Sequence, residues 1–142
     1  MEERYLYKAK RLDNGEWVAG HLITDEQDDS KCFIAYVFGT DEDGHPHDTD
    51  AVLVDNSTIC QCTGLKDKNC NMIWENDIMV AHLDDEYPED ETYQRVLWHE
   101  CGFYTKEKGC EEISSIDEFD QEHFEVCGNI FENAELLESE EM

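Results

Sequence analysis

The apolar residues of this chain recur in short segments that acidic or turn-forming residues separate. Asn14 and Gly15 lie between two such segments, and an Asn-Gly pair there is a strong signal for a β-hairpin because both residues tolerate a positive φ. Residues 33–38 and 51–54 are apolar runs of strand length, whereas residues 41–50 have the composition of a loop. The first half is therefore predicted to consist of strands joined by short loops.

The second half continues this pattern and adds two short helices. Further strands are predicted at residues 73–83, 95–98, 102–104 and 124–131. Ser115 and Glu118 fit a capping box that opens a helix running to about His123. Asn133 is placed to cap a second helix over residues 134–138. Mostly strands with two small helices indicate a mainly β, β-dominated α+β fold.

We expect a single domain with two parts that share one core, an N-terminal hairpin region of about residues 1–62 and a second half of about residues 63–142. A chain of 142 residues is long enough for such a core. Aromatic residues make up 11% of it, more than a disordered acidic chain would carry. The side chains expected inside are Trp17, Ile34, Tyr36, Phe38, Leu65, Ile73, Ile78, Val80, Val96, Trp98, Phe103, Val126, Ile130 and Leu136.

The charge of the chain limits what it can bind. There are 37 Asp and Glu residues against 10 Lys and Arg, which gives a formal net charge of -27. Nucleic-acid phosphates and anionic membrane surfaces would repel such a chain, so we expect no direct nucleic-acid or membrane partner. The longest apolar run, residues 33–38, is also far shorter than the roughly 20 residues that cross a bilayer.

Half of the basic residues lie in the first 40 positions. These residues are Arg4, Lys8, Lys10, Arg11 and Lys31. This segment can approach the acidic surface of a second copy with less repulsion than the rest of the chain. Self-association as a small homo-oligomer is therefore one expected mode of binding, beside binding to an unknown protein partner.

The seven cysteines are expected to be reduced. The chain opens on charged residues without an apolar export segment, which favours the cytoplasm, where thiols stay reduced. An odd number of cysteines cannot all be paired within one chain. We therefore expect buried thiols that pack as small hydrophobic groups.

Two groups of residues are candidates for a metal site. Cys60 and Cys62, with His99 and Cys101, could form a Cys-Cys-His-Cys zinc site if each pair lies on one face of a strand. One intervening residue is a looser spacing than structural zinc sites usually have, so we favour core cysteines, with no metal or other cofactor.

The second candidate lies in the acidic loop of residues 41–50. His45, His47, Asp48 and Asp50 could attract a divalent cation. The calcium-loop template fails there, because it needs an oxygen ligand at its fifth position and Gly at its sixth. A solvated loop is the favoured interpretation.

An ordered series of short motifs covers nearly the whole chain. An Asn-Gly-Glu-Trp-Val hairpin is followed by a Thr-Gly-Leu turn, a Glu-x-Asp turn before an apolar strand, and a closing Gly-Asn-Ile-Phe-Glu-Asn segment. The matching residues of the last three motifs are Thr63, Gly64, Leu65, Lys66, Asp67, Lys68, Asn69, Ile73, Glu75, Asp77, Gly128, Asn129, Ile130, Phe131, Glu132 and Asn133. In this series the chain resembles the YopX family of phage and prophage proteins. The resemblance implies a β-rich phage accessory protein whose second half is small and SH3-like or barrel-like, and it implies no established activity.

The motif residues have the character of turn formers. We expect Asp67 and Asn69 to bond local backbone, and Gly64 and Gly128 to allow sharp bends. None of these residue types in this arrangement points to catalysis.

Three positions depart from the family pattern. Asn76 stands where the pattern has Gly, and it can adopt a left-handed conformation at modest cost. Cys70 also replaces a Gly, and we expect the turn to change type there because the left-handed conformation costs Cys more free energy than Gly. Ala134 replaces a Pro and loosens the start of the last helix.

No catalytic motif accompanies the resemblance. The chain has no nucleophile elbow, phosphate-binding loop, metalloprotease helix or dinucleotide glycine motif. We therefore expect a non-enzymatic binding or self-assembling module. The alternative is an acidic decoy that imitates nucleic acid and occupies the basic cleft of a host protein.

Overall fold

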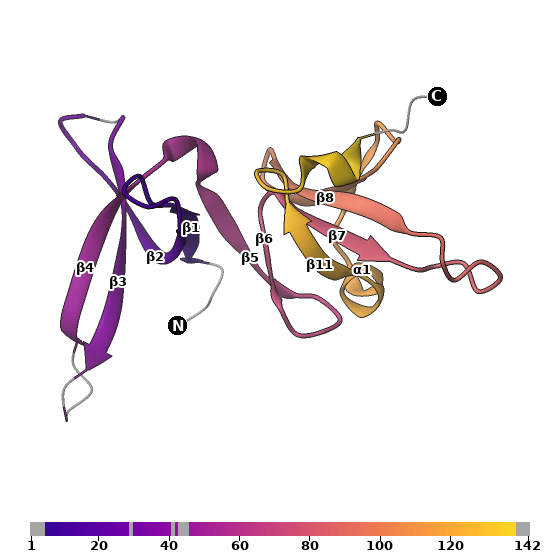
Figure 1. The fold of residues 1–142 in the computed structure, drawn as a ribbon, viewed down its shortest axis with the longest axis horizontal. Helices are drawn as coiled ribbons and strands as arrows, with labels where there is room; N and C mark the ends of the chain where they lie inside the picture. The colour runs from indigo at the N-terminus through magenta and orange to yellow at the C-terminus, as the bar shows by residue number, and fades with distance from the viewer. Residues whose placement is uncertain (1–4, 29, 41, 43–45, 139–142) are drawn as a thin grey trace. The chain divides into compact units, whose positions relative to one another are not determined.

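Figure 1 shows the protein as a computed structural model, which describes residues 5–28, 30–40, 42 and 46–138. Strands dominate these residues, so the expected β-dominated α+β class is confirmed. The chain divides into two compact units, Met1–Cys62 and Thr63–Met142. Each unit has its own cluster of buried side chains. That the two parts share one core stays a prediction.

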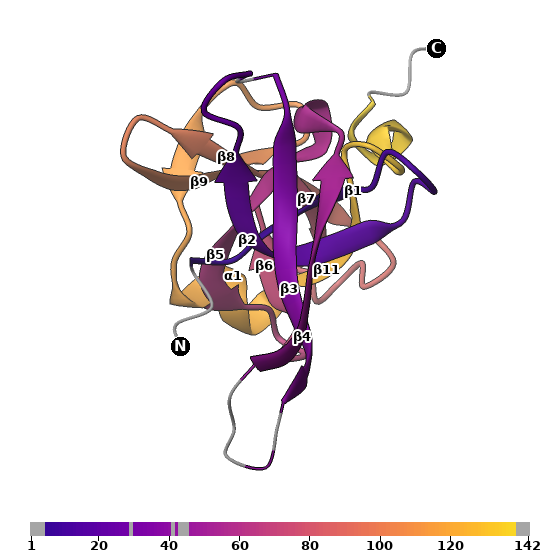
Figure 2. The ribbon, with the colours of Figure 1, turned by 90° about the vertical axis from the view of Figure 1, so that its left-hand side faces the viewer.

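The first unit is a series of antiparallel strands. They are β1 (Tyr7–Lys10), β2 (Trp17–Thr24), β3 (Cys32–Thr40) and β4 (Pro46–Val54), and a 3-10 turn, η2 (Asn56–Thr58), follows them. Figure 2 shows β3 between β2 and β4. β5 (Cys60–Lys66) continues into the second unit, and the hydrogen-bonded order is β4-β3-β2-β1-β5-β6, with β6 at Met72–Trp74.

The predicted Asn-Gly hairpin is confirmed between β1 and β2. The amide of Arg11 donates to the carbonyl of Glu16 at 2.8 Å, and the amide of Gly15 donates to the carbonyl of Arg11 at 2.9 Å. Gly15 has a φ of 73°, whereas Asn14 helps through its side-chain oxygen, which accepts from the amide of Glu16. The turn thus needs one left-handed residue, and glycine supplies it without a steric penalty.

The core of the first unit lies on one face of this sheet. It contains the buried side chains of Ala9, Cys32, Ile34, Val52 and Val54. Trp17, which we expected inside, is only half-buried. The ammonium groups of Lys8 and Lys10 lie over its ring at 4.9 and 5.5 Å from the centroid.

The second unit contains an open antiparallel sheet in the order β10-β9-β8-β7-β11. Its elements are β7 (Asp77–Ala81), β8 (Thr92–His99), β9 (Gly102–Glu107), β10 (Ile113–Ser115), α1 (Glu118–His123), β11 (Glu125–Asn129) and the 3-10 turn η3 (Ala134–Leu137). The half that we expected to be SH3-like or barrel-like is not a closed barrel in the described part of the chain, since β10 and β11 are opposite edges of the sheet. The chain enters α1 between them instead of closing the ladder.

Burial in the second unit centres on β7, where every residue is buried. The core expectation is confirmed for Ile34, Ile73, Ile78, Val80 and Val96, all buried. The half-buried members are Trp17, Tyr36, Leu65, Phe103, Val126, Ile130 and Leu136, and the side chain of Phe38 is outside the described part. Trp98 is 45% exposed, contrary to expectation, because it lies near the end of β8 and packs edge-on against Phe103 there.

The helix α1 ends at His123 as predicted, but its cap is not Ser115. Ser115 instead pairs with Tyr104 in the sheet, so its backbone is part of β10. Asp117 is the N-cap: its side chain accepts from the amide of Asp120, and the Asp120 side chain accepts from the amide of Asp117, each at 3.1 Å. The capping box is therefore two residues further along.

The segment after β11 is also held differently from the prediction. Asn133 precedes η3 but makes no side-chain cap bond to it. Its side-chain oxygen accepts from the amide of Asn129 at 3.2 Å instead. A Cβ on Gly128 would lie 2.3 Å from that oxygen, so Gly128 is needed for close approach rather than for a bend.

The turn between β5 and β6 is closed by two backbone hydrogen bonds and contains a left-handed residue. The amide of Asp67 donates to the carbonyl of Asn71 at 2.9 Å, and the amide of Cys70 donates to the carbonyl of Asp67 at 3.0 Å. Cys70 has a φ of 65°, so our expectation of a changed turn type is wrong. Asn76 is left-handed too, with a φ of 72°, as predicted.

No helix of the described residues has the length and apolar character needed to cross a membrane.

The left-handed Cys70 generates a stability prediction. Cys70→Gly should raise the free energy of unfolding by about 1 kcal/mol, because glycine removes the steric cost of this conformation. Urea unfolding measures the change. The matched control is Lys68→Gly in the same turn, which has no positive φ and should lose about 0.5–1 kcal/mol. An equal loss of unfolding free energy in both variants would contradict the left-handed conformation of Cys70.

Candidate functional site

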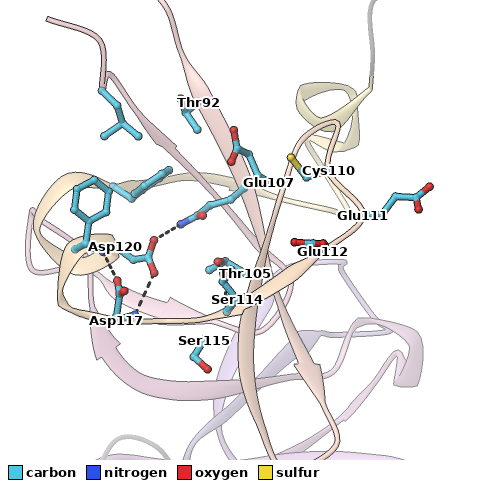
Figure 3. Close-up of a pocket in the computed structure, with 14 residues that line it drawn as sticks. Thr92, Thr105, Glu107, Cys110, Glu111, Glu112, Ser114, Ser115, Asp117 and Asp120 are labelled. Atoms are coloured by element: carbon cyan, nitrogen blue, oxygen red, sulfur yellow. Dashed lines mark hydrogen bonds between the residues drawn. The ribbon is translucent and has the colours of Figure 1, made fainter.

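The largest described cavity lies within the second unit, between α1 and the β9–β10 hairpin (Figure 3). Its volume is about 610 Å³. Thr92 and Gln94 of β8, with Thr105 of β9, line it from the sheet side. Ser114, Ser115, Cys110 and the first turn of α1 complete its wall.

The lining of this cavity carries negative charge only. Its ionisable carboxylates belong to Glu107, Glu111, Glu112, Asp117 and Asp120, and no Lys, Arg or His is among the described lining residues. Several hydroxyl groups add hydrogen-bonding capacity. The cavity is therefore suited to a group that is positively charged or rich in hydrogen-bond donors.

Part of the lining is apolar. Leu83, Phe119 and Phe124 belong to it, and of these Phe124 is buried. Leu83 is 41% exposed and Phe119 is 49% exposed, so both offer apolar surface to a ligand. A ligand that carries a cationic group on an apolar stem would match both parts of the lining.

Asp120 and Gln94 form the buried polar contact of the cavity. The amide nitrogen of Gln94 donates to Oδ1 of Asp120 at 3.0 Å, and both residues are less than 9% exposed. Burial raises the pKa of the Asp120 carboxyl above the ordinary value for aspartate, while the bond from Gln94 opposes that shift. Both oxygens of Asp120 are occupied, one by Gln94 and one by the capping box.

The arrangement lacks the parts of a nucleophilic site. Cys110 is exposed, and the described lining offers no histidine or lysine to activate its thiol. The raised pKa of Asp120 follows from its burial, and its carboxylate serves the helix cap. The cavity thus has the character of a binding site.

The residues of the predicted zinc candidate are not brought into a ligand set. Cys60 and Cys62 are buried on β5, as strand alternation predicts, and the Cys60 thiol donates to the carbonyl of Thr58. His99 and Cys101 lie at the exposed turn between β8 and β9. Within the described part of the chain, no group of three or more His, Cys, Asp or Glu side chains is placed to hold a metal ion.

The second metal candidate falls largely outside the described residues. Nothing is described for His45, nor for the side chains of His47 and Asp48. The backbone from Pro46 onward is strand β4 rather than loop, with Pro at the first position of an edge strand, where a missing amide is tolerated. Asp50 uses one carboxylate oxygen to accept from the amide of Ala51.

The thiols are less buried than we expected. The seven cysteines form no disulfide among the described residues, but only Cys32, Cys60 and Cys62 are buried. The exposed ones are Cys70, Cys101, Cys110 and Cys127. Each of these four lies in a turn or on an edge strand, where the chain has no second layer to cover it.

The sequence prediction missed the cavity. The sequence contains one local pattern that points to a residue of the cavity, the Asp-x-x-Asp spacing of Asp117 and Asp120. This spacing forms a capping box with aspartate in both positions. Gln94 gave no signal, because only the folded sheet places it against α1.

The buried position of Asp120 generates a titration prediction. Its carboxyl should titrate above the ordinary aspartate pKa, and Gln94→Met should raise that pKa further because a bond to the charged form is lost. The folded state then releases this proton at a higher pH than the unfolded chain. Ionisation of Asp120 therefore lowers the free energy of unfolding as pH rises through that interval. Carbon-13 NMR of the Asp120 carboxyl measures its pKa in the native chain and in Gln94→Met. A pKa at or below the ordinary aspartate value would contradict the burial of Asp120.

Comparison with known proteins places this fold in a family. The model of the family described as YopX protein matches residues 6–138. The crystal structure of protein EF1440 from Enterococcus faecalis is similar in fold, with a TM-score of 0.55 and 23% identity over 93% of this chain and 96% of that one. No curated protein matches the chain. The family match extends from β1 to the end of η3, and the chain belongs to the YopX family.

Proposed function

We propose that this protein is a non-enzymatic binding module of a phage or prophage, acting in the cytoplasm of the bacterial host without a cofactor. Its cavity in the second unit would receive a positively charged group of a partner protein. The observation that carries this proposal is the all-acidic lining beside exposed Leu83 and Phe119. The phage setting rests on the family resemblance.

The physical case for a cationic ligand rests on hydrogen bonding as well as charge. A lysine or arginine head group forms charge-assisted bonds to carboxylates, which are stronger than neutral ones. Its aliphatic stem can cover apolar surface while the charge stays near carboxylates. The cavity offers both kinds of lining within one unit.

The partner can be a second copy of this chain or a host or phage protein. The first unit carries basic side chains, Lys8 and Lys10 among them, although the chain as a whole has a net charge of -27. A homo-oligomer in which these side chains meet the acidic cavity of another copy is consistent with that distribution.

A diffuse decoy is the competing function, and the excess of 27 carboxylates over basic residues favours it. A decoy would bind a basic host cleft with its whole acidic surface, as a nucleic acid does. Its binding would fall steeply as salt rises, and no single group of carboxylates would dominate.

The test uses an acetylated and amidated Lys-Gly repeat peptide as the probe, titrated into the full chain by NMR. Saturable binding is expected, with shifts concentrated at residues that line the cavity. The double variant Glu107→Gln/Glu112→Gln should weaken binding by about tenfold, because two charge-assisted contacts are lost. Absence of saturable binding would overturn the proposal.

The matched control separates the cavity from the decoy. Glu86→Gln/Glu89→Gln removes the same charge from an exposed loop outside the cavity, and we expect less than a twofold change. Equal weakening by both double variants would indicate diffuse attraction and favour the decoy.

A further inference from the structure

A second, smaller cavity of the second unit has a different charge character. Its volume is about 380 Å³, and it lies where β8 and the β9–β10 hairpin approach Leu137 of η3. Arg95, Lys106 and Lys108 line it. These are three of the five basic residues in Thr63–Met142, the other two being Lys66 and Lys68.

The three basic side chains are not used in ion pairs. Glu107 and Glu111 also line the cavity, yet no carboxylate of the described residues pairs with Arg95, Lys106 or Lys108. In a chain with 37 carboxylates, three basic side chains that line one cavity and are not paired with its two carboxylates need a physical reason. Lys108 also lies over the ring of Tyr93, with its ammonium 5.8 Å from the ring centroid.

The strand register adds a cost to this arrangement. Arg95 and Lys106 are direct partners in the β8–β9 ladder. Side chains at such positions start about 5 Å apart, and like charges there are destabilising. The cost would be removed by an anion that lies between the two cationic groups.

Arg95 carries an independent sign that a partner is missing. Its Nε is buried and has no hydrogen-bond acceptor. One terminal nitrogen, Nη2, donates to Oδ1 of Asn76 at 2.9 Å, which fixes the guanidinium beside the β6–β7 turn. A buried donor without an acceptor costs free energy, so native structures rarely retain one without a role.

We propose that Arg95, Lys106 and Lys108 form a binding site for an oxyanion, namely the phosphate group of a small molecule. A guanidinium matches the oxygens of phosphate, and two flexible ammonium groups can close on the remaining ones. The distant carboxylates of the chain are screened beyond about 8 Å at physiological salt, so the sign of the field is decided by the lining, in which three basic side chains stand against two carboxylates. This site does not depend on the proposed cationic ligand of the larger cavity.

The experiment titrates inorganic phosphate into the full chain at constant ionic strength and follows amide shifts by NMR. Saturable binding is expected, with shifts at β8 and at residues 106–111. Lys106→Gln/Lys108→Gln should weaken it by about tenfold, since two charge-assisted contacts are lost. Lys66→Gln/Lys68→Gln removes the same charge outside the cavity and should change binding by less than about twofold. No saturation, or equal weakening by both pairs, would overturn the site.

A third variant tests the role of the neighbouring carboxylate. Glu111→Gln removes a negative charge from the lining and should tighten phosphate binding severalfold. Unchanged or weaker binding would contradict the inference that the Glu111 carboxylate and phosphate compete for the same basic groups. A parallel titration with adenosine monophosphate distinguishes the source of the phosphate: tighter binding than inorganic phosphate supports a phosphorylated metabolite, and equal binding supports free phosphate.

Discussion

The second unit depends on one buried carboxylate, that of Asp67. Its Oδ1 accepts from the amides of Asn69 and Asn71, each at 2.9 Å, and its Oδ2 accepts from the amide of Val126 at 2.8 Å. It therefore shapes the β5–β6 turn and also fastens that turn to β11, 59 residues further along the chain. Asp67 is 4% exposed, and the three amides compensate for the removal of its charge from water.

This attachment places the elements that form the larger cavity. The amide of Lys68 donates to the carbonyl of Phe124, so the same turn holds the C-terminal end of α1 as well as the start of β11. With α1 fixed, Asp120 lies against Gln94. Consecutive residues of β8 face opposite sides of the sheet, so Gln94 lines the larger cavity and Arg95 the smaller one. The two cavities still share Glu107, Cys110 and Glu111 in their linings.

Local chemistry explains what could be predicted from the sequence. The Asn14–Gly15 hairpin and the left-handed Asn76 are set by residues within one turn, so their signals are strong. The prediction of Ser115 as the helix cap was wrong because Ser115 pairs with Tyr104 in the sheet, and the residues around Ser115 in the sequence do not reveal that pairing. Asn69 was expected to bond local backbone, but its side-chain amide donates to the carboxylate of Glu125. The cavities arise from pairings between β8, β9 and α1, which no local pattern specifies.

The most direct test of this account is amide hydrogen exchange at Val126 in Asp67→Asn. Asparagine has the same shape but only one acceptor oxygen, so it cannot serve both the turn and β11. We predict a loss of protection at Val126 of about a hundredfold, equivalent to ~2.7 kcal/mol. The control is Asp84→Asn, whose carboxylate accepts from the amides of Glu86 and Tyr87 in an exposed loop. Unchanged protection at Val126 in Asp67→Asn, or an equal loss in the control, would contradict the central place of this carboxylate.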